Sequence, residues 1–141
     1  MRITTRGRYA LRASLALAKL GKDGAPVSIN TLSEEENISS VFLEQIFFKL
    51  RKAGIVSSVR GPGGGFYFAR PLDKLTLKEI LDAAGEELDL TNCDKQETKG
   101  CSRAGACLSH SVWAGVTALI NDYFSAITLA AILEKEHLGR K

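Results

Sequence analysis

Three cysteines and a histidine stand close together in the second half of this 141-residue chain. Cys93, Cys101 and Cys107 are its only cysteines, and His110 follows within the same 18-residue window. Cys107 and His110 are three residues apart at the start of an apolar-periodic segment, so one helix face would present both side chains. Three thiolates and one imidazole make a four-ligand set that suits an iron–sulfur cluster or a closed zinc site. Zinc fingers usually have two close ligand pairs and only one pair is close here, so the spacing favours the cluster without separating the two.

Other uses of these cysteines are weaker. A disulfide would leave one thiol over, and the chain shows neither an N-terminal signal segment nor a long apolar run. We therefore expect a cytoplasmic protein, in which disulfides seldom persist. Three inert, buried cysteines are disfavoured by polar neighbours such as Asp94, Lys95 and Arg103. A thiol redox switch is the main alternative to metal binding.

The charge is distributed unevenly although its total is only +3. Residues 1–70 carry 11 Lys and Arg against 5 Asp and Glu, whereas residues 71–141 carry 8 against 11. A basic half beside an acidic half indicates that one end of the protein meets a polyanion.

Hydrophobic periodicity predicts three helices in the basic half, over 8–20, 30–36 and 41–53. In the first, Leu11, Leu15 and Ala18 form the apolar face, and Ser39 or Ser40 can cap the third, which ends at Gly54. The buried stripe predicted for the third helix is Phe42, Leu43, Ile46, Phe47 and Leu50. The opposite side carries Val41, Glu44, Gln45, Phe48, Lys49 and Lys52. Two short helices joined by a tight turn, with amide and basic groups on the outside of the second, are typical of a helix-turn-helix.

A glycine-rich hairpin follows. Segments 55–59 and 66–69 have strand character, and Arg60, Gly61, Pro62, Gly63, Gly64 and Gly65 lie between them. A tip with so few side chains allows its backbone to approach a phosphate ribbon, and Arg60 supplies positive charge. Alone, the motif would be an ordinary glycine-rich turn. After a helix-turn-helix it predicts a wing, and hence DNA binding.

Within this unit we expect DNA contacts from Ser39, Ser40, Gln45 and Arg60. Gln45 has the two-headed amide that pairs with adenine in the major groove. Glu44 either accepts from a cytosine amino group or pairs with Lys49 or Arg51. Lys49 is a predicted phosphate contact whose position also suits a solvated surface.

In the acidic half, Thr76 and Glu79 form a capping box for a short helix that Gly85 ends. A long helix is predicted over about 108–127, and Thr128 caps a last short helix. The apolar stripe of the long helix is Val112, Val116, Leu119, Ile120, Tyr123, Phe124 and Ile127. Such a stripe needs a partner surface: we favour the same helix of a second copy, and expect the chain's own first helix to pack on a different face. The expected organisation is a winged helix-turn-helix over 1–75, followed over 76–141 by a linker helix, a cysteine loop (93–107) and a dimerisation helix.

Four segments, MRITTRGRYAL, LEQIFFKLRKAGIVSSVRGPGGGF, CLSHSVW and ITLAAIL, closely resemble the IscR-type iron–sulfur cluster regulators, which are bacterial winged-helix transcription factors. The resemblance implies a mainly α fold with a small β-hairpin, and a homodimer that binds a palindromic promoter element. It implies a two-iron, two-sulfide cluster on Cys93, Cys101, Cys107 and His110, and it places DNA contacts on Ser39, Ser40, Phe42, Glu44, Gln45 and the wing from Arg60 to Gly64. The gap between Cys93 and Cys101 is longer than is usual in the family, and Val41 and Phe48 are unusually apolar for a reading face.

The sequence thus predicts a non-enzymatic, cluster-controlled DNA-binding regulator, with His110 as the labile ligand because imidazole can be protonated. A winged-helix protein with structural zinc or a thiol switch is the alternative, and a small iron–sulfur electron carrier is a remote one.

Overall fold

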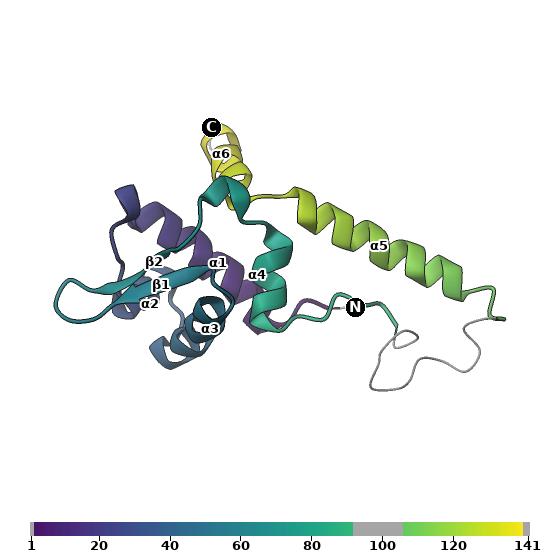
Figure 1. Ribbon diagram of the computed structural model, residues 1–141, viewed down its shortest axis with the longest axis horizontal. Coiled ribbons are helices and arrows are strands. Elements are labelled where there is room, and N and C mark those ends of the chain that lie inside the picture. Colours follow the sequence, from purple (N-terminus) through teal and green to yellow (C-terminus); the bar gives the residue numbers. More distant parts are fainter. Residues whose placement is uncertain (1, 92–105, 140–141) are drawn as a thin grey trace.

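A computed structural model describes residues 2–91 and 106–139 of the chain (Figure 1). Three helices come first: α1 (Thr5–Leu20), α2 (Ile29–Glu36) and α3 (Ser40–Lys52). The antiparallel strands β1 (Val56–Val59) and β2 (Gly65–Phe68) follow, then α4 (Leu77–Ala84), α5 (His110–Ala126) and α6 (Leu129–Gly139). Short 3₁₀ turns lie at Lys22–Gly24 and Leu72–Lys74. The architecture is mainly α with a small β-hairpin, as the sequence predicts.

Helix ends follow the capping residues. Ser28 and Ser39 accept hydrogen bonds from the amides of Thr31 and Phe42, at 3.1 and 3.4 Å. The Thr76–Glu79 capping box is present at the start of α4. Gly85 ends that helix with a φ of 89°, in the left-handed region that glycine adopts at least cost. These boundaries confirm the predicted helices to within three residues: α1 begins at Thr5 rather than 8, α2 at Ile29 rather than 30, and α5 at His110 rather than 108.

The core lies where α1, α3 and α4 meet the hairpin. Its fully buried side chains are Leu17, Leu32, Leu43, Ile46, Phe47, Leu50, Ile55, Leu75, Ile80 and Leu129. The predicted inner stripe of α3 is therefore confirmed except for Phe42, which is only half-buried. The hairpin pairs Val56 with Phe68 and Val59 with Gly65, and Phe66 also bridges to Val27, so the wing is anchored to the segment before α2.

The predicted apolar face of α1 is confirmed in part. Leu11 and Leu15 are half-buried and pack against the core, but the fully buried positions are the small residues Ala10, Ala13 and Ser14 together with Leu17. Small side chains let α3 and α4 approach the backbone of α1 closely, and a pattern of large apolar residues does not reveal that face.

The C-terminal helices extend from this unit and return to it. In Figure 1, α5 projects away from the winged domain, whereas α6 lies back beside it. The return is fixed by Leu129 N donating to Leu75 O at 2.9 Å and by Leu77 N donating to Ile127 O at 2.8 Å. Thr128 caps α6 by accepting from Ala131 N at 3.1 Å, as predicted. Of the helices described, none combines the length and apolar character needed to span a membrane.

Candidate functional site

One face of α3 is open to solvent. Ser39 caps the helix, and Val41, Glu44, Gln45 and Phe48 are all exposed. Glu44 and Gln45 each lie three or four residues from both Val41 and Phe48, so the four side chains form one stripe along the helix. The sequence predicted this face, including the uncommon presence of an acid and two apolar side chains among its polar groups. Lys49 is half-buried at its margin.

Aromatic contacts fix the orientation of α3. The Phe42 ring meets Tyr9 of α1 edge to face, with centroids 5.6 Å apart and planes at 82°. On the inner side of α3, the ring centroids of Phe47 and of Phe66 in the hairpin are 5.0 Å apart. Arg51 donates to the Ser58 hydroxyl at 3.2 Å, which ties the end of α3 to β1. Phe42 therefore supports the helix from its flank. Arg51 forms its hydrogen bond with the hairpin and not with Glu44.

A further bracket between α1 and α2 was not predicted from the sequence. The Arg12 guanidinium lies 5.2 Å from the centre of the Tyr9 ring and donates to Glu36 of α2. It meets the Glu36 carboxylate at 3.3 Å and the Glu36 carbonyl at 2.5 Å. Because the carbonyl is at the end of α2, this contact satisfies a group that the helix itself leaves unpaired. This contact therefore joins α1 to the end of α2, the helix that precedes α3.

The wing tip depends on glycine for two different reasons. Gly61 and Gly63 have φ of 97° and 74°, with open space where a Cβ would be. Gly64 and Gly65 are different, because a Cβ there would overlap the carbonyls of Val59 and Val27 respectively. The first pair gives a tip without side chains, Gly64 lets the tip fold closely onto the end of β1, and Gly65 allows the wing to lie against the segment before α2. Arg60 is exposed at the base of the tip.

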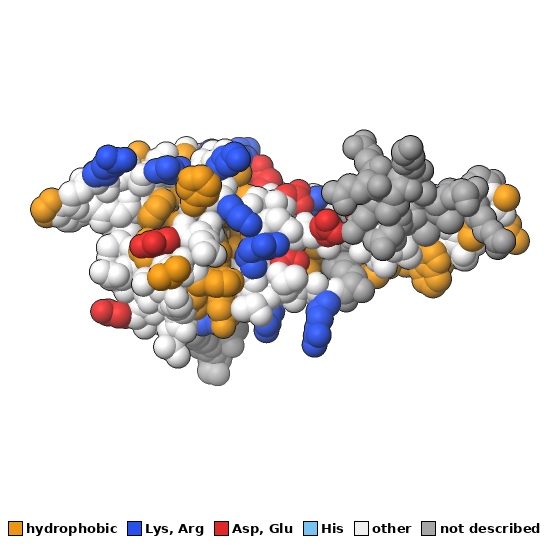
Figure 2. Space-filling model, turned by 90° about the horizontal axis from the view of Figure 1, so that it is seen from below, with side chains coloured by type: hydrophobic (Ala, Val, Ile, Leu, Met, Phe, Trp, Pro, Cys, Tyr) orange, Lys and Arg blue, Asp and Glu red, His pale blue; other side chains and the backbone are white. Residues whose placement is uncertain are grey.

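Figure 2 views the molecule from the side on which α2 and α3 lie in Figure 1. Lys and Arg side chains are spread across this face with hydrophobic side chains between them, and acidic side chains also occur, several of them toward the middle of the molecule. This agrees with the excess of basic residues in the first half of the sequence. Such a field attracts a polyanion at long range.

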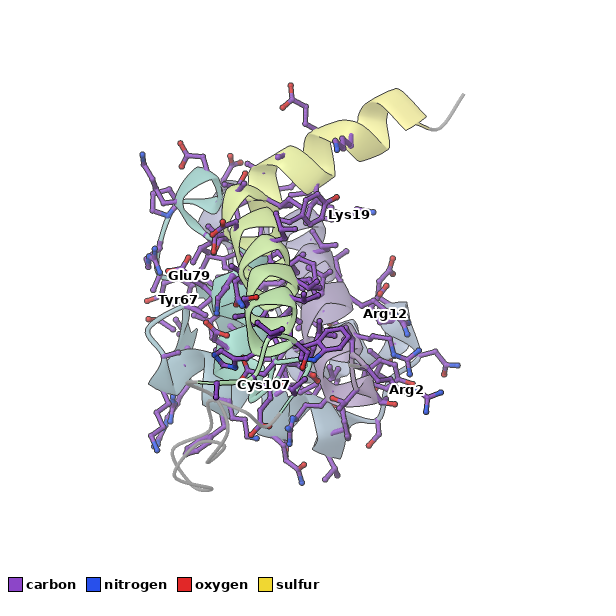
Figure 3. The ribbon with its side chains drawn as sticks, turned by 90° about the vertical axis from the view of Figure 1, so that its right-hand side faces the viewer. Arg2, Arg12, Lys19, Tyr67, Glu79 and Cys107 are labelled. Atoms are coloured by element: carbon purple, nitrogen blue, oxygen red, sulfur yellow. The ribbon has the colours of Figure 1, made fainter. Side chains whose placement is uncertain are left out.

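The cysteine window is described only in part. Cys93 and Cys101 lie outside the described residues, so no cluster of three or more metal-binding side chains is found in the part that is described. Cys107 is exposed, and its carbonyl accepts from His110 N at 3.2 Å. Its Sγ is 3.0 Å from the Ser109 hydroxyl. That hydrogen bond lowers the pKa of the Cys107 thiol below its usual 9.0. Figure 3, which looks along α5, shows Cys107 at the near end of this helix.

These two donors fit a soft metal centre. A thiol ligates as the thiolate, so a lowered pKa favours binding, and Cys107 is accessible. His110 is the first residue of α5, so a ligand bound by both residues would be attached directly to that helix.

The apolar stripe of α5 has an inner and an outer side. No residue of α5 is fully buried in the single chain. Phe124 and Ile127 pack on a small cluster made by Leu77, Leu81 and Leu88. The outer side remains bare: Val112, Leu119 and Tyr123 are 55%, 70% and 64% exposed. Leu11 of α1 packs on the same cluster, so the inner side of the stripe and the first helix share it, whereas a second copy on the outer side stays a prediction.

A buried carboxylate links the start of α1 to the end of α4, and no sequence pattern predicts it. Glu86, 7% exposed, accepts from Gly7 N at 3.0 Å and from Thr4 N at 3.2 Å, and also from the Thr4 hydroxyl. Arg6 donates to Gly85 O at 3.2 Å beside it. Glu86, just before the segment that leads to the cysteine window, is thereby hydrogen-bonded to the first turn of α1.

Comparison with known proteins identifies the family. The family model of Rrf2, described as an iron-dependent transcriptional regulator, matches residues 3–135. The chain belongs to the Rrf2 family. A Neisseria meningitidis protein, described as a candidate HTH-type transcriptional regulator, is 42% identical over 139 residues, which make up 99% of this chain and 92% of that protein. The HTH-type transcriptional regulator IscR of Xenorhabdus nematophila is 38% identical over 138 residues, covering 98% and 82%.

Solved structures agree. IscR of T. potens matches with a TM-score of 0.76 and 31% identity over 100% of this chain and 92% of that one. CymR of B. subtilis, the global cysteine regulator, matches with a TM-score of 0.77 and 25% identity over 96% and 98%. This Rrf2 protein is therefore a transcriptional regulator with the winged-helix fold of IscR and CymR, and its relatives are regulators rather than enzymes.

Proposed function

We propose that this Rrf2 protein is a homodimer that reads a palindromic DNA element with α3 and the wing, under the control of an iron–sulfur cluster held by Cys93, Cys101, Cys107 and His110. Chromosomal DNA is the partner, so the protein would work in the bacterial cytoplasm.

The observation that carries the DNA-reading part is the pairing of a bare helix face with a bare hairpin tip. The exposed stripe of α3 presents the Gln45 amide, and the wing beside it ends in glycines that leave its backbone accessible. A helix of this kind fits the major groove, while Arg60 suits the neighbouring narrow groove. We assign Ser39, Ser40, Glu44, Gln45, Lys49 and residues 60–64 to DNA contact. Phe42 supports α3 from its flank through the contact with Tyr9.

The dimer is supported by the outer side of α5. Leu119 and Tyr123 would be costly to leave in water on a helix that has no buried residue of its own. The same surface on a second copy covers them with one two-fold axis, and a two-fold dimer reads two symmetric half-sites.

The cluster is supported by the donor chemistry at the start of α5 and by the family description of iron dependence. When bound, it would give the protein a centre that iron supply or oxidation can change. Cys107 and His110 would transmit its presence to α5, while Glu86 fixes the other end of the same segment to α1. Occupancy would thus bias how two winged domains are spaced on DNA.

A thiol switch is the second candidate. Cys107 is exposed with a lowered pKa, which favours oxidation. CymR of Staphylococcus aureus, 28% identical with a TM-score of 0.69, has been solved in an oxidized form.

Affinity for DNA tests the proposal. A duplex is selected from a random library by anaerobically purified protein, and binding is compared before and after removal of iron by a chelator. We expect the selected sequence to be palindromic and its affinity to change on chelation, and Cys107→Ser protein to behave like chelated wild type. If chelation leaves DNA affinity unchanged, but a mild oxidant alters the affinity of iron-free protein, the thiol switch and not the cluster controls DNA binding.

A further inference from the structure

Two large apolar side chains interrupt the outer stripe of α3. Val41 is 62% exposed and Phe48 is 58% exposed, and Glu44 and Gln45 lie between them. Val41 is the second residue of the helix, directly after the serines that begin it. Neither side chain belongs to a hydrophobic cluster in the described part of the chain.

Helix formation does not account for Val41. Valine is β-branched and a weak helix former, and the first turn of a helix favours acidic or small polar residues because of its partial positive charge. The first turn of α3 holds no acid. A residue that breaks the local rule and buries nothing marks a position selected for contact with a ligand.

The position of Val41 also matches what a reading helix needs. In a helix-turn-helix the N-terminal residues of the second helix reach the base edges. Val41 and Gln45 are one turn apart on the same face, about 6 Å along the axis at 1.5 Å per residue. That separation corresponds to roughly two base-pair steps of 3.4 Å.

Only one base offers an apolar partner there. In the major groove every base pair presents donors and acceptors, but thymine alone adds a methyl group, on C5. The valine methyls cannot accept or donate a hydrogen bond, so they match that group and no other.

We propose that Val41 is a specificity residue that packs against the 5-methyl group of a thymine, within about two base pairs of the base read by Gln45. This rests on the proposed function, because it requires α3 to be the helix that enters the major groove.

The test removes the methyl groups one at a time. In the duplex selected by the protein, each thymine is replaced in turn, in both half-sites, by deoxyuridine, which lacks only the 5-methyl. We expect one position at which the replacement weakens wild-type binding about fourfold per half-site, the equivalent of about 0.8 kcal/mol for one buried methyl-sized group. Val41→Ala should bind the thymine duplex more weakly by a similar factor and should be indifferent to deoxyuridine at that position.

Val59→Ala is the matched control, because Val59 is a valine of similar exposure (48%) on the hairpin rather than on α3. It should keep the full deoxyuridine penalty, and both variants should unfold at the wild-type temperature. The proposal is overturned if no thymine shows a methyl-dependent loss, or if Val41→Ala keeps the wild-type penalty at every thymine. Failure of the proposed function is a different result, since then no duplex is enriched from the library at all.

Discussion

The Glu86 clamp makes a quantitative prediction about stability. Replacing Glu86 with alanine removes the acceptor of the Gly7 and Thr4 amides, which lie 3.0 and 3.2 Å from its carboxylate. Hydrogen bonds to a charged group contribute about 1.5–3 kcal/mol each to stability. The Thr4 hydroxyl, 3.4 Å from Gly7 N, recovers part of the loss. We therefore expect Glu86→Ala to lower the free energy of unfolding by about 3 kcal/mol.

In thermal unfolding this corresponds to a fall of roughly 6–12 °C, at about 2–4 °C per kcal/mol for a chain of this size. Glu86→Gln keeps one oxygen acceptor and should lose about half as much. Glu34→Ala, which removes an exposed carboxylate on α2, is the control and should change stability by less than about 0.5 kcal/mol. Hydrogen exchange gives the local readout, because the Gly7 amide should lose protection first. A Glu86→Ala protein that melts with the wild type, with Gly7 still protected, would refute the clamp.

Three further predictions concern other parts of the molecule. Leu119→Asp places a charge on the outer side of α5 and should raise the dissociation constant of the dimer at least tenfold, measured by sedimentation. A dimer of unchanged stability would show that this side of α5 is not the dimer interface. Gly65→Ala should loosen the hairpin, because a Cβ there would overlap Val27 O. It should lower the free energy of unfolding by about 2 kcal/mol or more and should weaken DNA binding. Gly54→Ala, also at positive φ but in open space, is the control and should lower the free energy of unfolding less, as measured by chemical denaturation. The pKa of Glu79 is lowered below 4.5 by the Thr76 amide and then by Arg70, so its stabilising effect is complete above pH 4.5 and is lost as pH falls through the lower folded value. Glu79→Gln should thus be less stable than wild type at neutral pH and equal to it in acid, and a constant difference across that range would contradict the assignment.

Local rules made the winged domain predictable from sequence. Ser39, the Thr76–Glu79 box and Gly85 each act within a few residues of the chain, so their spacing alone identified where helices begin and end. The glycine run after a helix-turn-helix identified the wing for the same reason. The outer stripe of α3 followed from helical periodicity.

Contacts between distant residues were not predictable in this way. Glu86 lies 79 residues from Gly7 in the chain, and nothing in either segment indicates that they meet. Arg12 and Glu36 lie 24 residues apart in the chain, and no local pattern indicates that they meet. The most buried face of α1 was only partly predicted, because it holds the small residues Ala10 and Ala13 as well as Leu17, and small side chains give a weak apolar signal. The ligand set of the cysteine window remains a prediction, since Cys93 and Cys101 lie outside the described residues.

We propose that one inorganic centre, bound by three cysteines and His110, governs DNA binding. Its most direct test is the iron and acid-labile sulfide content of oxygen-free protein, measured with visible absorbance for wild type, Cys107→Ser and Cys93→Ser. We expect coloured wild-type protein with iron and sulfide in equal amounts, and colourless variants with altered DNA affinity. The proposal is wrong if wild-type protein contains zinc or no metal and both variants bind DNA with the wild-type affinity.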